Sequence, residues 1–184
     1  PSLAGRRFDG VFHLAAAVGV DLVLADPLRA IETNLRETEV ILKAAAKAGA
    51  PIMLASTSEV YGKSRQPALR ETDELIIGPP HLSRWSYACS KLMDEFIGMA
   101  HHRRSGLPVT IVRLFNTVGP RQTGRYGMVL PRFIEAALSG EPLRVHGDGS
   151  QARCFCHVRD TVQALMLLHQ HKGAAGEVFN VGRP

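Results

Sequence analysis

The segment PIMLASTSEVYG, residues 51–62, decides the fold of this chain. Its first half is a continuous apolar run bounded by turn-forming residues, which predicts a fully buried strand of a parallel sheet. Hydroxyl side chains and a carboxylate follow at the carboxyl end of that strand, where open parallel sheets bind their ligands. Thr57, Ser58 and Glu59 are therefore placed to contact a substrate. The alternative is an ordinary turn or helix cap, because serine and threonine favour those positions.

Strand and helix patterns alternate upstream of this segment. Residues 10–19 begin as a short buried strand and turn into small residues. Asp26 and Pro27 then start a helix, because a capping side chain is followed by proline in the first turn, and Gly49 ends it. One face of this helix is marked by residues that recur at spacings of four and three, and it could pack against the sheet or against a second copy of the chain: Ile31, Leu35, Thr38, Leu42 and Ala45.

The alternation continues downstream. The sequence predicts strands at 108–115, 142–147, 152–158 and 177–182, and helices at about 87–105, 128–140 and 159–171. Strands that alternate with helices imply βαβ units, right-handed crossovers and a parallel sheet covered by helices. The expected fold class is therefore α/β, with a doubly wound parallel sheet.

Composition limits the function classes. The chain is 45% hydrophobic and 21% charged, as expected for a globular protein, and no apolar run approaches the roughly 18 residues of a membrane span. The net charge of +5 is spread along the chain and aromatic residues make up only 6%. A nucleic-acid surface usually clusters basic residues with aromatics, whereas scattered arginines suit a small polyphosphate ligand.

Cysteine usage indicates the compartment and the metal content. Three cysteines, an odd number, argue against a disulfide framework and for the reducing cytoplasm. Cys154, Cys156 and His157 are close enough in sequence to suggest a metal site. A strand that alternates between two faces explains them more simply, because no second cluster completes four ligands. No metal is therefore predicted.

Tyr87 and Lys91, in the segment RWSYACSKLMDE (84–95), lie one helical turn apart and share a face. An ammonium beside a phenol favours phenolate, so the phenol pKa is expected to fall. Tyr87 would then act as a general base near neutral pH. The Y-x-x-x-K pattern alone is a weak signal, since two residues on the surface of a helix match it equally well.

Together, the strand that ends in STSE and the later Y-x-x-x-K helix resemble the extended short-chain dehydrogenase/reductase superfamily. More narrowly, the chain resembles its NAD-dependent nucleotide-sugar epimerase/dehydratase family. Other segments that match, in the family's order, are 13–16, 32–34, 113–121, 140–160 and 176–182. The resemblance implies that residues 1–120 form a Rossmann core without its first strands. It also implies that 121–184 form part of a nucleotide-sugar-binding region, mixed with the last core elements.

The resemblance also implies roles for individual residues. Tyr87 would be the catalytic base, Lys91 its partner that also holds the nicotinamide ribose, and Thr57 the hydrogen-bond partner of the sugar 4-hydroxyl. NAD would be a recycled cofactor that passes the sugar through a 4-keto state. The family's other cofactor positions fall on Leu14, Ala15, Ala16, Ala17, Val18, Asn34 and Phe115. Its substrate positions fall on Ser58, Asn116, His146 and Arg153.

The implied contacts of four of these residues can be stated more closely, and one of the four has an alternative explanation. Asn34 matches an asparagine near the nicotinamide, but it lies beside the apolar stripe and could equally be a tolerated edge residue. Asn116 and Arg153 match positions that contact the sugar diphosphate. His146 falls where the family usually has an aromatic residue against uracil.

The family's reactions diverge after the 4-keto intermediate. A UDP-sugar 4-epimerase is the expected function, because it demands the fewest residues beyond Thr57, Tyr87 and Lys91. A UDP-glucuronate decarboxylase or a sugar 4,6-dehydratase is the alternative, because these use an extra carboxylate that Glu59 would supply. Ser58 departs from the Asp-Glu pair of the dehydratases. A non-catalytic fragment that serves in binding or assembly is the alternative from another class.

The sequence departs from the family in two places. It contains no G-x-x-G-x-x-G loop, which normally binds the cofactor pyrophosphate, and family members are longer at the carboxyl end. The chain is therefore expected to be a fragment that is inactive by itself. The resemblance also implies a UDP-sugar substrate and a homodimer formed through helices 27–48 and 87–105, with no nucleic-acid or membrane partner.

Overall fold

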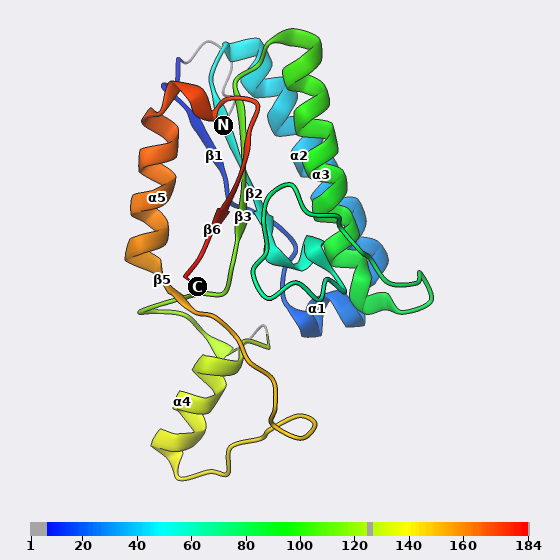
Figure 1. Ribbon diagram of the computed structural model, residues 1–184, viewed down its shortest axis with the longest axis vertical. Coiled ribbons are helices and arrows are strands. Elements are labelled where there is room, and N and C mark those ends of the chain that lie inside the picture. The colour runs from blue at the N-terminus through cyan, green and yellow to red at the C-terminus, as the bar shows by residue number, and fades with distance from the viewer. Residues whose placement is uncertain (1–6, 125–126, 184) are drawn as a thin grey trace.

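A parallel sheet forms the centre of the molecule (Figure 1). The structure is a computed structural model that describes residues 7–124 and 127–183. Within these ranges the sheet has four strands in the order β1-β2-β3-β6: Val11–His13, Ile52–Thr57, Val109–Leu114 and Val178–Val181. All neighbouring strands are parallel. The predicted α/β fold with a parallel sheet is confirmed.

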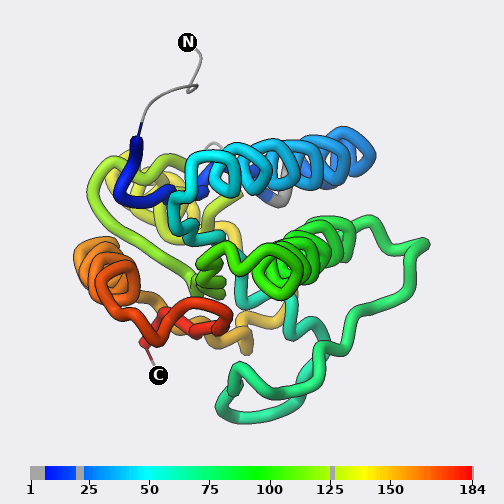
Figure 2. Tube along the Cα trace, turned by 90° about the horizontal axis from the view of Figure 1, so that it is seen from above, coloured from blue at the N-terminus to red at the C-terminus, as the bar shows by residue number. Residues whose placement is uncertain are grey.

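Helices cover both faces of the sheet (Figures 1 and 2). Helices α2 (Pro27–Ala48) and α3 (Ser86–Ser105) pack side by side on one face, and α5 (Val158–Gln170) covers the other. Successive residues of β2 point to opposite sides, as the strand period requires. Leu54 joins the apolar cluster under α2, and Met53 joins the cluster under α5.

Helix α2 begins and ends where the sequence predicts. The Asp26 side chain accepts a hydrogen bond from the Arg29 backbone N–H at 3.0 Å, and Gly49 ends the helix with a φ of 63°. The face marked by the sequence pattern is buried only in its later part, because Ile31 and Leu35 are half-buried. The residues that are buried are Ala30, Asn34, Thr38, Leu42 and Ala45. The first part of this face is small or polar because it packs against polar partners, which a count of apolar residues misses.

The region around helix α4 (Val129–Ser139) extends below the sheet in Figure 1. We call residues 127–155 the α4 lobe. None of the residues of α4 is buried, and residues 137–153 are all exposed. The predicted strand at 142–147 is wrong, because the described part of the chain gives this segment no strand to pair with.

The remaining differences from the sequence predictions are short elements. The predicted strand at 152–158 is reduced to β5 (Cys156–His157), which pairs in parallel with β4 (Thr117–Val118). A short helix, α1 (Val20–Ala25), follows the β1 loop and was not predicted. The three cysteines are free. No helix within the described ranges is both long and apolar enough to span a membrane.

Candidate active site

The carboxyl end of β2 places Thr57 at the edge of the sheet. Its side-chain oxygen accepts a hydrogen bond from the Glu59 backbone N–H at 3.2 Å and caps a short 3₁₀ helix, Ser58–Tyr61. The cap that the sequence allows as an alternative is therefore present. A hydroxyl that accepts one bond still has its own proton to donate, so capping leaves Thr57 able to hydrogen-bond a substrate oxygen.

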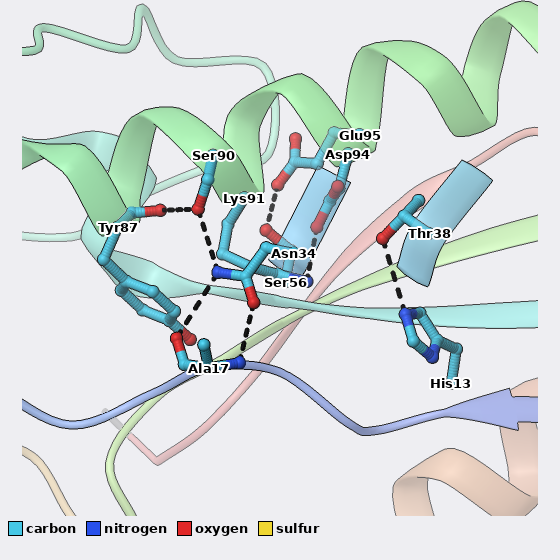
Figure 3. A network of polar contacts seen from close by, with 10 residues as sticks. All are labelled: His13, Ala17, Asn34, Thr38, Ser56, Tyr87, Ser90, Lys91, Asp94 and Glu95. Carbon is cyan, nitrogen blue, oxygen red and sulfur yellow. Dashed lines mark hydrogen bonds and ion pairs between the residues drawn. The ribbon is translucent and has the colours of Figure 1, made fainter. Parts of the chain in front are cut away.

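Helix α3 carries Tyr87 and Lys91 in its first two turns. The Lys91 ammonium donates to Asp94 Oδ2 at 2.8 Å, and both side chains are only 3% exposed. In Figure 3 the Lys91 side chain runs toward Asp94, whereas the Tyr87 ring points toward Ala17. Lys91 therefore shares its charge first with a carboxylate that the sequence analysis did not consider.

The expected fall in the pKa of the Tyr87 phenol is wrong for this arrangement. Burial raises the pKa of Tyr87 above its ordinary value, and the negative charges of Glu59 and Asp94 raise it further. The spacing of Tyr87 and Lys91 was identified correctly, but the ammonium is paired elsewhere. A lysine lowers a neighbouring phenol pKa only when its charge is not already neutralised.

Asn34 links the loop after β1 to helix α3. Its Oδ1 accepts a hydrogen bond from the Ala17 backbone N–H at 2.7 Å, and its Nδ2 donates to the Ser90 hydroxyl at 3.0 Å. Ser90 in turn donates to the backbone carbonyl of Tyr87 at 2.9 Å (Figure 3). Asn34 is 2% exposed, so it is a buried link between two parts of the site and not a tolerated edge residue.

The loop after β1 presents small side chains beside this link. Leu14 and Val18 are 55% and 39% exposed, and the three alanines between them carry only methyl groups. A backbone without bulky side chains lets a ligand approach closely. The loop therefore fits one side of a dinucleotide cofactor, although the chain contains no glycine-rich pyrophosphate loop.

A second buried network fixes the end of β2 against α3. Glu95 accepts hydrogen bonds from Arg113 Nε at 3.0 Å and Nη2 at 2.8 Å, and it also accepts one from the Ser56 hydroxyl. Arg113 Nη1 donates to the Tyr61 hydroxyl at 2.9 Å, and that hydroxyl donates to Asn180 Oδ1 at 2.8 Å. These polar bonds set the position of α3 relative to Thr57.

Sequence reasoning named Asn34, Ala17 and Tyr87 of the first network. It missed Asp94, the partner of Lys91, and the residues of the second network. A signal was present, because Arg113 lies inside an apolar strand and Asp94 and Glu95 lie on the sheet-facing side of α3. Charged residues are almost never fully buried unless they are paired. A charge inside a predicted core element therefore predicts a buried partner, although not its identity.

Glu59 is desolvated by the protein and lies within reach of two positive charges. The residue as a whole is exposed, yet the protein around its carboxyl group desolvates it and raises its pKa, while Arg84 and Arg153 act in the opposite direction. Arg84, which the sequence analysis did not select, lies over the Trp85 ring with its Cζ 4.8 Å from the centroid. A carboxyl with a raised pKa binds a proton more readily than a carboxyl in water.

The remaining predicted residues lie farther from the α3 networks. Phe115 follows β3, with its ring centroid 6.5 Å from that of Tyr61. Asn116 Nδ2 donates to the Cys154 carbonyl at 3.0 Å and anchors the end of the α4 lobe. His146 and Arg153 are exposed in that lobe. The structure thus groups Thr57, Glu59 and Tyr87 at the sheet edge with Arg153 within electrostatic reach, and it shows no contact between His146 and this group.

Two hollows in the described part of the chain lie away from Thr57, Tyr87 and Lys91. One lies beneath α4 and includes Ile134 and Leu138. The other lies beside β6 and includes Asn180. The candidate site itself is a sheet edge with buried polar supports.

Known proteins show clear similarity to the chain. A model of the NAD dependent epimerase/dehydratase family matches residues 2–182. A UDP-N-acetyl-alpha-D-glucosaminuronate decarboxylase of Bacillus cytotoxicus is 46% identical over 96% of this chain and 54% of its own length. UDP-glucuronic acid decarboxylase 6 of Arabidopsis thaliana is 37% identical over 96% of this chain and 50% of its own length. The chain spans about half the length of these curated relatives.

A solved structure agrees with the fold as well as the sequence. The UDP-glucuronic acid 4-epimerase of Bacillus cereus, solved in complex with UDP-glucuronic acid and NAD, matches with a TM-score of 0.86 and 30% identity. The match covers 96% of this chain and 55% of that one.

Proposed function

The chain belongs to the NAD dependent epimerase/dehydratase family, and on that premise we propose that the full-length protein is an NAD-dependent UDP-uronate decarboxylase. The proposed substrate is UDP-glucuronate or its 2-acetamido counterpart, UDP-N-acetylglucosaminuronate. This choice revises the sequence-based preference for a 4-epimerase, because the curated relatives at 46% and 37% identity described above are decarboxylases. The proposed reaction class is therefore lyase chemistry.

The observation that carries the proposal is the place of Glu59. It lies two residues after Thr57, and its charge acts on the Tyr87 phenol. An epimerase needs no additional acid there. Decarboxylation leaves a carbanion at C5 of the sugar that must be protonated, and a carboxyl with a raised pKa is suited to deliver that proton.

In the proposed mechanism, the residues of this chain handle the protons. Tyr87 removes the proton of the sugar 4-hydroxyl while Thr57 hydrogen-bonds the same oxygen. In the resulting 4-keto sugar, the C6 carboxylate is β to the C4 ketone, and β-keto acids lose carbon dioxide. The C5–C6 bond breaks, carbon dioxide leaves, and the electron pair of that bond moves toward C5 and the 4-keto oxygen. Thr57 and the protonated Tyr87 stabilise that oxygen, and Glu59 supplies the proton to C5.

The family's cofactor fits the residues that are present. The loop from Leu14 to Val18 has three small alanines at its centre, and Lys91 supplies a cation one turn from Tyr87. NAD bound there would oxidise C4 of the sugar at the start and restore the alcohol at the end. Asn34 would hold the loop in place for it through the Ala17 backbone.

A UDP-sugar 4-epimerase is the second candidate function. The observation that favours it is the solved 4-epimerase with a TM-score of 0.86 to this chain. Thr57, Tyr87 and Lys91 would suffice for this reaction too. Both candidate functions share the same proposed binding residues. His146, Asn116 and Arg153 would bind the nucleotide diphosphate. Ser58 would contact the substrate and Phe115 the cofactor. The division of the chain at residue 120 also stays a prediction.

We propose that the full-length protein is a cytoplasmic homodimer. The outer faces of α2 and α3 leave large apolar side chains exposed, including Val40 at 60%, Met93 at 50% and Phe96 at 60%. A second copy would bury them in a helical bundle. The exposed free thiol of Cys89 fits a reducing compartment. Light scattering on the wild type and on Phe96→Asp tests the dimer, since the variant should be monomeric.

The test of function uses the full-length protein with NAD⁺. We would incubate it separately with UDP-glucuronate and with UDP-N-acetylglucosaminuronate, and identify the products by mass and NMR. Loss of carbon dioxide from either substrate supports the decarboxylase and identifies the sugar. An epimer of unchanged mass supports the 4-epimerase. A Glu59→Gln variant that decarboxylates as fast as the wild type would remove Glu59 from the mechanism, and no product from either sugar would reopen the non-catalytic alternative.

A further inference from the structure

The Lys91–Asp94 ion pair is the buried charge arrangement that the proposed mechanism leaves unexplained. The two side chains are 3% exposed and 2.8 Å apart. Asp94 Oδ2 binds Lys91, and the Thr38 hydroxyl is a second polar neighbour of the carboxylate. Burial raises the pKa of Asp94, while Lys91 and Thr38 act in the opposite direction. The buried pair therefore carries a desolvation cost that its bonds offset only in part.

Residues of α2 and β1 enclose the pair, which itself lies on α3. Thr38 from α2 is fully buried beside it. His13 from the end of β1 lies within 3.4 Å of the Thr38 hydroxyl, measured from its Nε2 (Figure 3). Burial, and next the charge of Lys91, lowers the pKa of His13, while Asp94 and Glu37 act in the opposite direction. His13 is therefore neutral near pH 7, and Asp94 is the acid that faces the Lys91 ammonium.

The same carboxylate acts on Tyr87. The charges that raise the pKa of the Tyr87 phenol come from Glu59 in the 3₁₀ helix and from Asp94 in α3. Lys91 is nearer to Tyr87 in sequence than Asp94 is, but its ammonium is turned toward Asp94 (Figure 3). Movement of one lysine side chain between the two partners would change the charge that the phenol experiences.

We propose that Asp94 is a positioning residue that holds the Lys91 ammonium away from Tyr87 and so controls how much of that positive charge reaches the phenol. The proposal rests on the proposed function in one respect, namely that Tyr87 is the base. While Lys91 is bound to Asp94, the phenol keeps its proton. When Lys91 turns toward Tyr87 and a ligand at the β1 loop, the orphan Asp94 carboxylate is left with Thr38 and His13 as polar neighbours.

The test is a pH titration of the Tyr87 phenol in the full-length protein. Phenolate formation is followed by ultraviolet absorbance in the wild type and in Asp94→Asn, each subtracted from its own Tyr87→Phe partner so that only Tyr87 contributes. Removal of one negative charge and release of Lys91 should shift the titration to lower pH by about one pH unit or more. Asp94→Glu, which keeps the charge, should restore a titration near that of the wild type.

The outcomes separate this proposal from the proposed function, because the titration needs no substrate. An unchanged Tyr87 titration in a folded Asp94→Asn protein would overturn the role of Asp94 even if decarboxylation is observed. A shifted titration supports it even if the enzyme acts on another sugar. If Asp94→Asn does not fold, Asp94→Ser, which leaves room for water beside Lys91, takes its place with the same expected shift. Failure of both neutral variants to fold would assign Asp94 a structural role and overturn the proposal.

Discussion

Polar residues are buried and bonded to one another on the α3 side of the molecule, whereas those of the α4 lobe are exposed. Arg113 is 4% exposed and bonded to Glu95 and Tyr61. Arg153 is exposed, and the hydrogen bond found for it goes to the carbonyl of its own neighbour, Ala152. The difference separates a part of the candidate site that buried hydrogen bonds hold in place from a part that is open to solvent.

The comparison assigns different tasks to the two regions. Groups that move protons must be held within fractions of an ångström, which buried hydrogen bonds achieve. Groups that bind a flexible diphosphate can remain mobile until the ligand arrives. We therefore expect changes near α3 to affect the rate constant and stability, and changes in the α4 lobe to affect mainly substrate affinity.

The largest expected effect is the loss of catalysis in Tyr87→Phe. Removal of a general base typically costs about 10²- to 10⁴-fold in rate, while the ring that packs at the start of α3 is kept. Steady-state kinetics of the full-length protein would show kcat lowered by this factor and the melting temperature nearly unchanged. Arg153→Met is the matched change in the α4 lobe, and we expect it to raise KM while kcat changes little. A drop in kcat for Arg153→Met as large as that of Tyr87→Phe would contradict the division of tasks.

The next effect is on stability and compares two glutamates. Glu95→Gln breaks the buried pair with Arg113, and we expect it to lower the free energy of unfolding by about 3–5 kcal/mol, because the guanidinium is left without its counter-charge. Glu141→Gln makes the same chemical change at an exposed position of the α4 lobe and should stay within about 0.5 kcal/mol. Urea unfolding measures both. Equal losses would show that the α4 lobe is as tightly coupled to the core as α3.

The sequence predicted the features that depend on local pattern. The strand of residues 51–56, the start of α2 at Asp26 and Pro27, and the spacing of Tyr87 and Lys91 all follow from apolar runs, capping chemistry and helical period. Each of these signals lies within a few consecutive residues. For this reason the parallel sheet and the edge that carries the candidate site could be inferred before the structure.

The sequence did not predict features that depend on partners far along the chain. On α3, Lys91 has Tyr87 one turn before it and Asp94 one turn after it, and the sequence allows either as its partner. Only the packing of α2, α3 and β1 decides which of the two it pairs with. The apolar stripe of α2 does not reveal that Asn34 is buried, because its partners Ala17 and Ser90 lie on other elements. The strand predicted at 142–147 has an apolar alternation but no neighbour to pair with.

A smaller effect comes from two glycines with positive φ. Gly62, which ends the 3₁₀ helix after β2, has a φ of 59°, and an added Cβ would lie 2.2 Å from the Ile76 carbonyl oxygen. Gly140 ends α4 with a φ of 70° and has nothing within 4 Å of such a Cβ. In both alanine variants the left-handed backbone should lower the free energy of unfolding by about 1–2 kcal/mol. Overpacking should lower it by about 1–3 kcal/mol more in Gly62→Ala. Thermal unfolding of the two variants measures the difference in stability between them. Equal losses of stability would show that the loop at Ile76 moves aside for the added methyl group.

The smallest expected effect is the pH dependence that His13 gives to stability. Burial and the Lys91 charge lower the pKa of His13 below its ordinary value of about 6.5. At pH well above 6.5 the ring is neutral in both the folded and the unfolded chain, so it adds no pH dependence. As the pH falls below about 6.5, the unfolded chain binds a proton that the folded chain resists, and the free energy of unfolding decreases until the folded pKa is reached.

Urea unfolding at a series of pH values should therefore show the wild type losing stability as pH falls from about 7. His13→Gln, which keeps a polar group near Thr38 but does not titrate, should show a smaller loss over the same interval. An identical slope in the variant would place the titrating group elsewhere. His13 would then be an ordinary core residue, and the Lys91–Asp94 pair would be enclosed by neutral groups that take no part in its charge balance.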